Sequence, residues 1–290
     1  MSISIIFNGK KVGRFYIRRL IKSMKLIDYL NNINTTLSES PIPWLQVVIV
    51  ALMGIVFGSF LNVLIYRIPK GEEFVKTSSH CMKCGHKLAW YDNIPLFSWL
   101  TLGGKCRYCK EKISAQYPII EATNGILWVA IVLLLGLSIH SIALCFITSG
   151  LLALSVIDWR TYEIANGFHV YIGVFAAINL LFDYPNWLSY VIGFFAVSLL
   201  LLAIYLVSGG RAIGGGDVKL MAVCGLFLGW QNVLLSLAIG CIVGSIVHIL
   251  RMKLSGANKV LAMGPYLSIG VLVSALFGNQ IIAWYIGLLG

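Results

Sequence analysis

Charged side chains are scarce in this sequence. Only 11% of its 290 residues are Asp, Glu, Lys or Arg, whereas 59% are hydrophobic. A soluble domain usually carries about 25% charged residues, so this composition excludes a soluble globular protein. Hydrophobic runs of roughly 20 residues recur along the chain, and neither a transmembrane β-barrel nor a small disulfide-bonded secreted scaffold has such runs. We therefore expect an all-α polytopic membrane protein.

Eight hydrophobic segments predict about eight transmembrane helices. The sixth segment is short for a full crossing, because an α-helix rises only about 1.5 Å per residue. The eight segments are residues 44–66, 118–137, 139–157, 168–182, 187–207, 218–230, 231–250 and 262–288. The chain is thereby divided into an N-terminal extension (1–43), a first transmembrane helix (44–66), a cytoplasmic loop (67–117) and a transmembrane core (118–290).

Basic residues outnumber acidic residues by 22 to 11, a balance that nucleic-acid binding could explain. Their positions indicate membrane topology instead. Nine of the 22 lie between Arg67 and Tyr117, and none lies near His140 or between Asp183 and Asn186. Because basic residues concentrate in the cytoplasmic loops of membrane proteins, we expect no nucleic-acid partner. The loops predicted to be cytoplasmic are residues 67–117, 158–167, 208–217 and 251–261.

The basic N-terminal stretch conflicts with this topology. Residues 1–43 contain seven Lys or Arg, and a cytoplasmic first loop would place them on the opposite side of the membrane. This stretch has no apolar core of about 7–15 residues before a small-residue cleavage site, so it does not read as a signal peptide. Translation from Met24 would leave only Lys25 among these basic residues. Mass spectrometry of the native N-terminus tests that hypothesis.

Four of the seven cysteines form two Cys-x-x-Cys pairs in the polar loop. Cys81 and Cys84 form the first pair, and Cys106 and Cys109 form the second. Two such pairs in a reducing, cytoplasmic loop predict a tetrahedral structural zinc site, because four thiolates leave the metal no open position for catalysis. The metal would supply folding energy to a loop with little apolar core. Alternative ligands nearby are His80 and His86.

Two aspartates stand at the ends of apolar segments. Asp158 ends the third segment, and Asp217 opens the sixth after the run Gly214–Gly216. Taken singly, each could be a helix cap or an interfacial end residue. The predicted topology places both at the cytoplasmic face, and the glycines let the backbone approach closely. Two carboxylates at one membrane depth can share a proton and activate water, which is the chemistry of an aspartyl protease.

The sequence around the second aspartate, Gly214-Gly-Gly-Asp217-Val-Lys219, resembles the GxGD motif of membrane aspartyl proteases. The wider pattern resembles the type IV prepilin leader peptidase/N-methyltransferase family from about Pro43 to the C-terminal end. The family pattern usually has a proline where this chain has Ala165, which we interpret as a change in loop stiffness. The supporting segments are residues 57–69, the two cysteine pairs, residues 90–99 and residues 117–121.

The resemblance implies a bifunctional enzyme of the bacterial inner membrane. It would cleave the basic leader of type IV prepilins or pseudopilins at the cytoplasmic face, with Asp158 and Asp217 as the catalytic pair. It would then methylate the new N-terminal amine, with S-adenosylmethionine as methyl donor. In this family, methyl transfer is associated with the first cytoplasmic loop and with a glycine at the position of Gly104. Gly104 is equally well interpreted as a turn residue ahead of the second cysteine pair. Polar residues at the membrane edges of the same loop are Asn62, Arg67 and Glu121.

Three alternatives use the same features. An ion-coupled transporter could carry protons or ions on Asp158 and Asp217, with the glycine-rich break as a discontinuous helix. That class predicts internal repeat symmetry, and we find no convincing repeat between the two halves of the sequence. A zinc-binding membrane scaffold without catalysis leaves the paired aspartates unexplained. A leader peptidase without methyltransferase activity is the third alternative, although such relatives commonly lack the cysteine loop.

Overall fold

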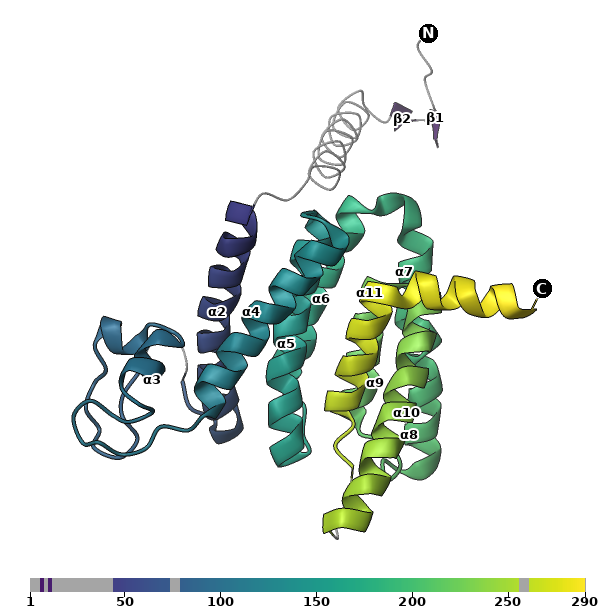
Figure 1. The fold of residues 1–290 in the computed structure, drawn as a ribbon. Helices are drawn as coiled ribbons and strands as arrows, with labels where there is room; N and C mark the ends of the chain where they lie inside the picture. Colours follow the sequence, from purple (N-terminus) through teal and green to yellow (C-terminus); the bar gives the residue numbers. More distant parts are fainter. Residues whose placement is uncertain (1–5, 8–9, 12–43, 74–78, 256–260, 290) are drawn as a thin grey trace.

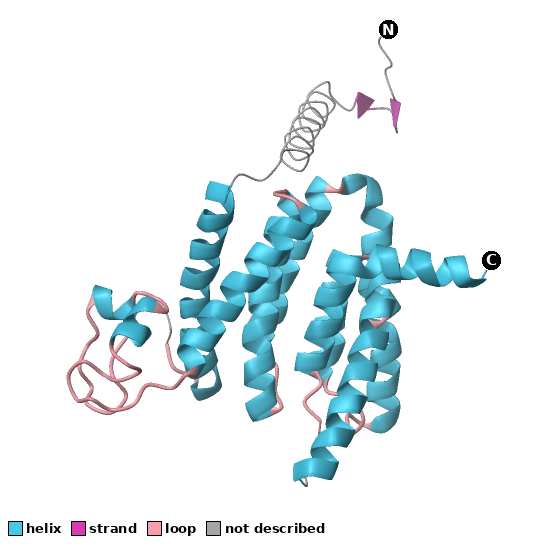
Figure 2. Ribbon diagram, viewed as in Figure 1, coloured by secondary structure: helices cyan, strands magenta, loops and turns pink. Residues whose placement is uncertain are grey.

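The protein is almost entirely helical (Figure 2). A computed structural model describes residues 6–7, 10–11, 44–73, 79–255 and 261–289. Two short strands, β1 (Ile6–Phe7) and β2 (Lys10–Lys11), form one antiparallel pair. The predicted all-α membrane architecture is confirmed, whereas Met24 and most of the N-terminal extension lie outside the described residues.

Among the described residues, six helical segments are long and apolar enough to cross a membrane. Five of them are each built on one α-helix: α2 (Trp44–Arg67, extended to Lys70 by a short 3-10 helix), α4 (Gln116–Leu135), α5 (Ile139–Thr161), α10 (Trp230–Ser255) and α11 (Gly264–Leu289). The sixth, Tyr184–Ser208, contains η3 (Tyr184–Asn186), α7 (Trp187–Ala196) and α8 (Ser198–Ser208). Two further apolar helices are shorter: α6 (Asn166–Phe182) and α9 (Gly215–Leu228). The protein is therefore multi-pass, while the exact count of eight crossings is not confirmed.

The short helix α9 is enclosed by protein. Its 14 residues extend about 21 Å, less than the roughly 30 Å of a bilayer's hydrocarbon core. Helices α6, α7, α8, α10 and α11 all pack against it. The approach of α7 is very close, because a Cβ atom on Gly225 would lie 2.1 Å from the carbonyl oxygen of Gly193. Neighbouring helices, rather than lipid, thus determine where α9 lies.

Helices α2, α4 and α5 are joined through glycine contacts and a buried polar network. A Cβ atom on Gly54 would lie 2.9 Å from the Cα atom of Gly125. The Asn124 side chain donates a hydrogen bond of 2.7 Å to the carbonyl of Gly54 and accepts one of 2.7 Å from Ser149. The Trp128 indole donates to the same serine at 2.9 Å. Small residues and satisfied polar groups are the usual means of helix association in membranes.

Successive long helices run in alternating directions, so their connections gather at two ends of the bundle (Figure 1). One end carries the loop after α2, the α5–α6 turn, the α8–α9 turn, the end of α10 and the start of α11. The two predicted catalytic residues, Asp158 and Asp217, therefore lie at the same end as the cysteine loop. That loop contains η1 (Ile68–Lys70), η2 (Trp90–Asn93) and α3 (Phe97–Thr101).

Candidate functional site

Asp158 lies in the last turn of α5 and is only 5% exposed. Its Oδ2 atom accepts a hydrogen bond of 2.8 Å from the backbone N–H of Gly264, the first residue of α11. A Cβ atom on Gly264 would lie 2.7 Å from the same oxygen. The glycine therefore gives the carboxylate a donor and leaves it the space that any larger residue would fill.

Asp217 lies in the first turn of α9, where unpaired backbone N–H groups favour negative charge. Its side chain is partly buried, and its N–H donates to the carbonyl of Gly214 at 3.1 Å. A Cβ atom on Gly214 would lie 3.2 Å from the Oδ2 atom of Asp217, and one on Gly216 would lie 3.1 Å from the Cβ atom of Ile164. As expected from the sequence, the glycines permit close approach at this helix start.

The structure brings the two aspartates together. Asp158 at the end of α5 lies close enough to Asp217 for the two negative charges to interact. Helices α6 and α11 each pack against both α5 and α9, so they set the separation between the helix that carries Asp158 and the helix that carries Asp217. The pair therefore has what the carboxylate chemistry requires: two acidic groups at one end of a membrane bundle, each beside a backbone N–H donor or helix start.

Three residues to which the sequence analysis assigned no role lie at the start of α6 or α9, next to this site. The Nε2 atom of His169 lies 3.0 Å from the carbonyl oxygen of Gly216. The Lys219 ammonium donates a hydrogen bond of 2.9 Å to the side chain of Asn166. Both contacts join the start of α6 to the start of α9. The available signal was His169 itself, an ionisable residue inside an apolar run, which is a reason to examine it for function.

The four loop cysteines converge on one point. Their sulfur atoms all lie within 4.8 Å of one another, and the Sγ atoms of Cys81 and Cys109 are 3.7 Å apart. Four thiolates around a tetrahedral zinc, with zinc–sulfur bonds of about 2.3 Å, have sulfur–sulfur separations of about 3.8 Å. The donor set and its dimensions therefore fit zinc. His86 instead stacks on Tyr108, with ring centroids 3.6 Å apart.

Each cysteine pair is formed by the same turn. In the first, the N–H of Gly85 donates to the carbonyl of Cys81 at 2.8 Å, and in the second, the N–H of Lys110 donates to that of Cys106 at 3.0 Å. Gly85 and Lys110 both have left-handed backbone, with φ of 71° and 61°. Hydrogen bonds from the backbone N–H groups of Cys84 and Lys83 lower the pKa of Cys81 to about 6, whereas burial and the neighbouring cysteine side chains raise the pKa of Cys109 to about 12, so a thiolate forms first at Cys81.

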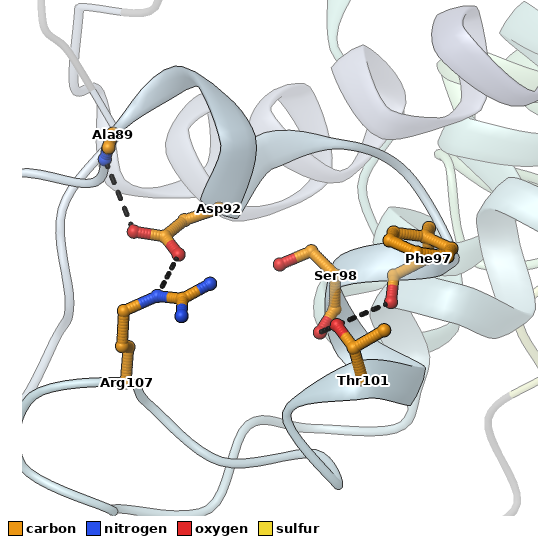
Figure 3. Close-up of polar contacts among 6 residues, drawn as sticks. All are labelled: Ala89, Asp92, Phe97, Ser98, Thr101 and Arg107. Atoms are coloured by element: carbon orange, nitrogen blue, oxygen red, sulfur yellow. Dashed lines mark hydrogen bonds and ion pairs between the residues drawn. The ribbon is translucent and has the colours of Figure 1, made fainter.

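Asp92 ties the two halves of the loop together (Figure 3). Its Oδ1 atom pairs with the Arg107 guanidinium at 2.7 Å, and its Oδ2 atom accepts a hydrogen bond of 3.4 Å from the N–H of Ala89 at the start of η2. The Asp92 side chain is 3% exposed. In the short helix α3, the Thr101 hydroxyl bonds to the carbonyl of Phe97 at 2.9 Å. The loop thus has internal polar order besides the cysteine cluster.

A cavity of about 440 Å³ lies between the loop and the adjoining ends of α2 and α4. Ligand pockets in proteins commonly measure about 300–1,000 Å³. The cavity borders the cysteine cluster through Cys81 and Cys106, and it reaches Arg160 in the last turn of α5. Other lining residues include Asn62, Arg67, Asp92, Trp99, Tyr117 and Glu121.

Two residues singled out from the sequence shape the cavity wall. Glu121 is 5% exposed and accepts a hydrogen bond of 2.7 Å from the N–H of Leu96, a residue held at a φ of 60°. Gly104 has a φ of 66°, and a Cβ atom there would lie 2.8 Å from the indole ring of Trp99. Since Trp99 lines the cavity, Gly104 supports the wall by contacting this ring.

Two family profiles together match most of the described helical region. The profile of the Bacterial Peptidase A24 N-terminal domain matches residues 52–135, which include the four loop cysteines. The profile of the Type IV leader peptidase family matches residues 145–249, which include both aspartates. No solved structure gives a significant match.

Curated relatives match over nearly their full length. A prepilin leader peptidase/N-methyltransferase of Stutzerimonas stutzeri is 32% identical over 86% of this chain and 96% of its own. One from Pseudomonas aeruginosa is 31% identical over 92% and 99%, and one from Aeromonas salmonicida is 31% identical over 84% and 95%. These identities and the two profile matches show that the chain belongs to the type IV leader peptidase family.

Proposed function

We propose that this protein removes the leader peptide of type IV prepilins or pseudopilins and then N-methylates the newly exposed residue. The names of the curated relatives support both activities. The observation that carries the proposal is that Asp158 and Asp217, whose charges interact, lie at the same end of the bundle as the cysteine loop. No other described feature explains why two carboxylates are held close enough for their charges to interact.

For peptide cleavage, we assign Asp158 and Asp217 as the catalytic pair. Two carboxyl groups whose charges interact do not both ionise readily, so we assign one as protonated and the other as ionised. The ionised carboxylate takes a proton from water as the water attacks the scissile carbonyl, while the protonated one donates a proton to the carbonyl oxygen. As the carbon–nitrogen bond breaks, the first carboxyl gives the proton that it took from water to the leaving amine, and the second carboxylate takes a proton back from a hydroxyl of the tetrahedral intermediate. The N–H of Gly264 orients Asp158 during these steps.

We place this site at the cytoplasmic face of a bacterial inner membrane. The end of the bundle that carries the aspartates also carries the basic loop from Arg67 to Tyr117, and basic loops are retained in the cytoplasm. Reporter fusions after Lys87, Arg160 and Arg211 are expected to report the cytoplasm, and a fusion after Asp183 the opposite side. A result that puts the α5–α6 and α8–α9 turns on different sides would defeat the assignment.

We assign zinc to the cysteine cluster as a structural metal. Bound there, zinc would supply four bonds that cross-link the two cysteine turns. The chain's own contribution is the preorganised turns and the lowered pKa of Cys81. Because Cys81 and Cys106 line the cavity, the metal would fix one of its walls.

We assign the cavity to S-adenosylmethionine, which when bound supplies a methyl group from a positively charged sulfonium. The buried carboxyl group of Glu121 lines this space, and an anionic group stabilises such a cation, whereas the neighbouring Asp92 is already paired with Arg107. The rings of Trp99 and Tyr117 offer aromatic surface for a planar base. The cavity and the two aspartates lie at the same end of the bundle, which is where a cleaved N-terminus would be released.

Binding can be tested without turnover. S-adenosylhomocysteine, titrated calorimetrically into the full-length protein, is expected to bind, and Glu121→Gln should weaken binding of S-adenosylmethionine about tenfold by removing a charge. The matched control is Glu163→Gln, an exposed carboxylate in the α5–α6 turn. Equal affinity for wild type and Glu121→Gln would remove the cavity assignment while leaving the peptidase assignment intact.

The decisive test of the peptidase is the pair of substitutions Asp158→Asn and Asp217→Asn. Each keeps the size of the side chain but prevents the alternation of acid and base, so each should abolish leader removal from a co-expressed prepilin. The double variant should be no worse than either single one, because the two act as a unit. Asp183→Asn is the control and should cleave normally, because Asp183 follows the last residue of α6, at the opposite end of that helix from the α5–α6 turn.

Mass spectrometry of the pilin N-terminus measures both leader cleavage and methylation. Loss of the leader reports cleavage, and a gain of one methylene mass reports methylation. Methylation of an already cleaved pilin should survive both aspartate substitutions. Near-normal cleavage by either single variant would instead favour the ion-carrier alternative. Cleavage without methylation by the wild type would establish a leader peptidase alone.

A further inference from the structure

His169 contacts the backbone immediately before Asp217. It lies near the start of α6, is 6% exposed, and places its Nε2 atom 3.0 Å from the carbonyl oxygen of Gly216. A carbonyl oxygen can only accept a hydrogen bond, so the Nε2 atom carries the proton and donates it. The imidazole thereby ties α6 to the peptide unit that leads into Asp217.

A second contact joins the start of α6 to the start of α9. The Lys219 ammonium donates to the side chain of Asn166 at 2.9 Å. Asn166 and His169 are three residues apart on α6, as are Gly216 and Lys219 on α9, and residues at that spacing share one helix face. Facing surfaces of the two helix starts are therefore joined at two successive points. Gly216 has no room for a side chain, because Ile164 occupies the space.

The surroundings of His169 keep the imidazole neutral. Its Nδ1 atom is buried and has no hydrogen-bond partner among the described residues. Protonation would create a buried N–H donor without an acceptor, close to the positive charge of Lys219. A neutral ring with its proton on Nε2 is the form that both nitrogen environments favour. The histidine thus acts as a fixed donor rather than as an acid or base.

We propose that His169 is a positioning residue of the leader peptidase: by holding the Gly216 carbonyl, it fixes Asp217 opposite Asp158. Helix α6 packs against α5, which carries Asp158, as well as against α9, which carries Asp217. A residue on α6 can therefore fix the position of Asp217 relative to Asp158. The proposal rests on the proposed peptidase function and adds to it a residue that touches neither substrate nor reacting atoms.

The test compares His169→Gln, His169→Leu and His140→Leu in the full-length protein. Glutamine can present an N–H donor at nearly the reach of Nε2, whereas leucine cannot. His140 is the matched control: it is a histidine on an apolar helix with one side-chain hydrogen bond, 2.9 Å to Asn179, at the other end of the bundle. Leader cleavage is measured as kcat and KM separately, and methylation of a pre-cleaved pilin reports the folded state.

We expect His169→Leu to lower kcat for leader cleavage by about 10- to 100-fold with little change in KM, since small misplacement of a catalytic group costs this much. His169→Gln should recover most of that loss, and methylation should be unchanged in both. Wild-type kcat in His169→Leu would overturn the proposal. So would loss of cleavage and methylation together in both His169 variants, or an equal fall in His140→Leu, because each marks a packing role.

Failure of the proposed function gives a different pattern. A wild-type protein that does not cleave, or an Asp217→Asn variant that does, removes the peptidase and with it the role of His169. Normal behaviour of those two proteins, combined with wild-type kcat in His169→Leu, removes the positioning role alone.

Discussion

The carboxylate of Asp158 is held by the backbone N–H of Gly264, a residue 106 positions later in the chain. The contact joins the end of α5 to the start of α11 and leaves no space for a Cβ atom, which would lie 2.7 Å from the carboxylate oxygen. The precision of this site therefore depends on a residue that is not itself acidic. It follows that a single methyl group at position 264 can disable the aspartate pair.

Gly264→Ala is expected to lower leader cleavage by about 100-fold, because the added carbon forces the Asp158 carboxylate from its position. Methylation of a pre-cleaved pilin should change little. The control is Gly287→Ala in the same helix, where an added Cβ atom meets nothing within 4 Å. Cleavage rates of the two variants in membranes check the prediction, and equal rates would contradict it.

The purified protein is expected to contain about one zinc per chain. Cys81→Ser should remove most of it and make the segment from Arg67 to Tyr117 sensitive to protease, because a closed tetrahedral site loses a ligand. Cleavage should fall less than methylation, since the metal borders the cavity rather than the aspartates. Cys241→Ser, a cysteine alone on α10, serves as control. Metal analysis that finds no zinc in an active preparation would contradict this prediction.

The two cysteine turns should respond in opposite ways to substitution at the same position. Gly85→Ala places a Cβ atom on a residue with a φ of 71° and should destabilise the loop by about 1 kcal/mol. Lys110→Gly, at the equivalent position with a φ of 61°, relieves the same strain and should leave the loop equally or more stable. Thermal release of zinc from each variant measures the difference. A stabilising Gly85→Ala would show that the turn is not as described.

Ala165→Pro is expected to stabilise the protein by about 0.4–1 kcal/mol. Ala165 already has a φ of −64° at the start of α6, close to the roughly −65° that a proline ring imposes. Ala212→Pro is the matched control and should destabilise, because the N–H of Ala212 donates to the Ser208 hydroxyl at 3.3 Å. Thermal unfolding in detergent ranks the variants, and a lower Tm for Ala165→Pro than for wild type would refute the prediction.

Local sequence patterns were sufficient for the cysteine cluster and for placing the aspartates at one end. The Cys-x-x-Cys spacing is itself enough to predict a tight turn at each cysteine pair. The alternating direction of successive apolar segments places Asp158 and Asp217 on one side of the membrane, and this placement does not depend on how the helices pack. Gly264 and His169 were not predictable in this way. Their contacts depend on how α11 and α6 pack against α5 and α9, and no short-range pattern specifies such packing.

The helix boundaries were also predicted from the sequence only in part. Hydropathy located the apolar runs, but it could not show that the run 187–207 is divided between α7 and α8 at Val197. It also could not separate a lipid-facing helix from α9, which is apolar because five neighbouring helices surround it. The cavity was likewise unpredictable, since its walls come from α2, α4, α5 and the loop together.

The enclosure of α9 separates the enzyme's geometry from the thickness of its membrane. A helix that meets lipid must match its apolar length to the bilayer or tilt to compensate. Helix α9 is surrounded by α6, α7, α8, α10 and α11 instead, so the depth of Asp217 is set by those helices. A change in bilayer thickness therefore acts on Asp217 only through the helices that surround α9.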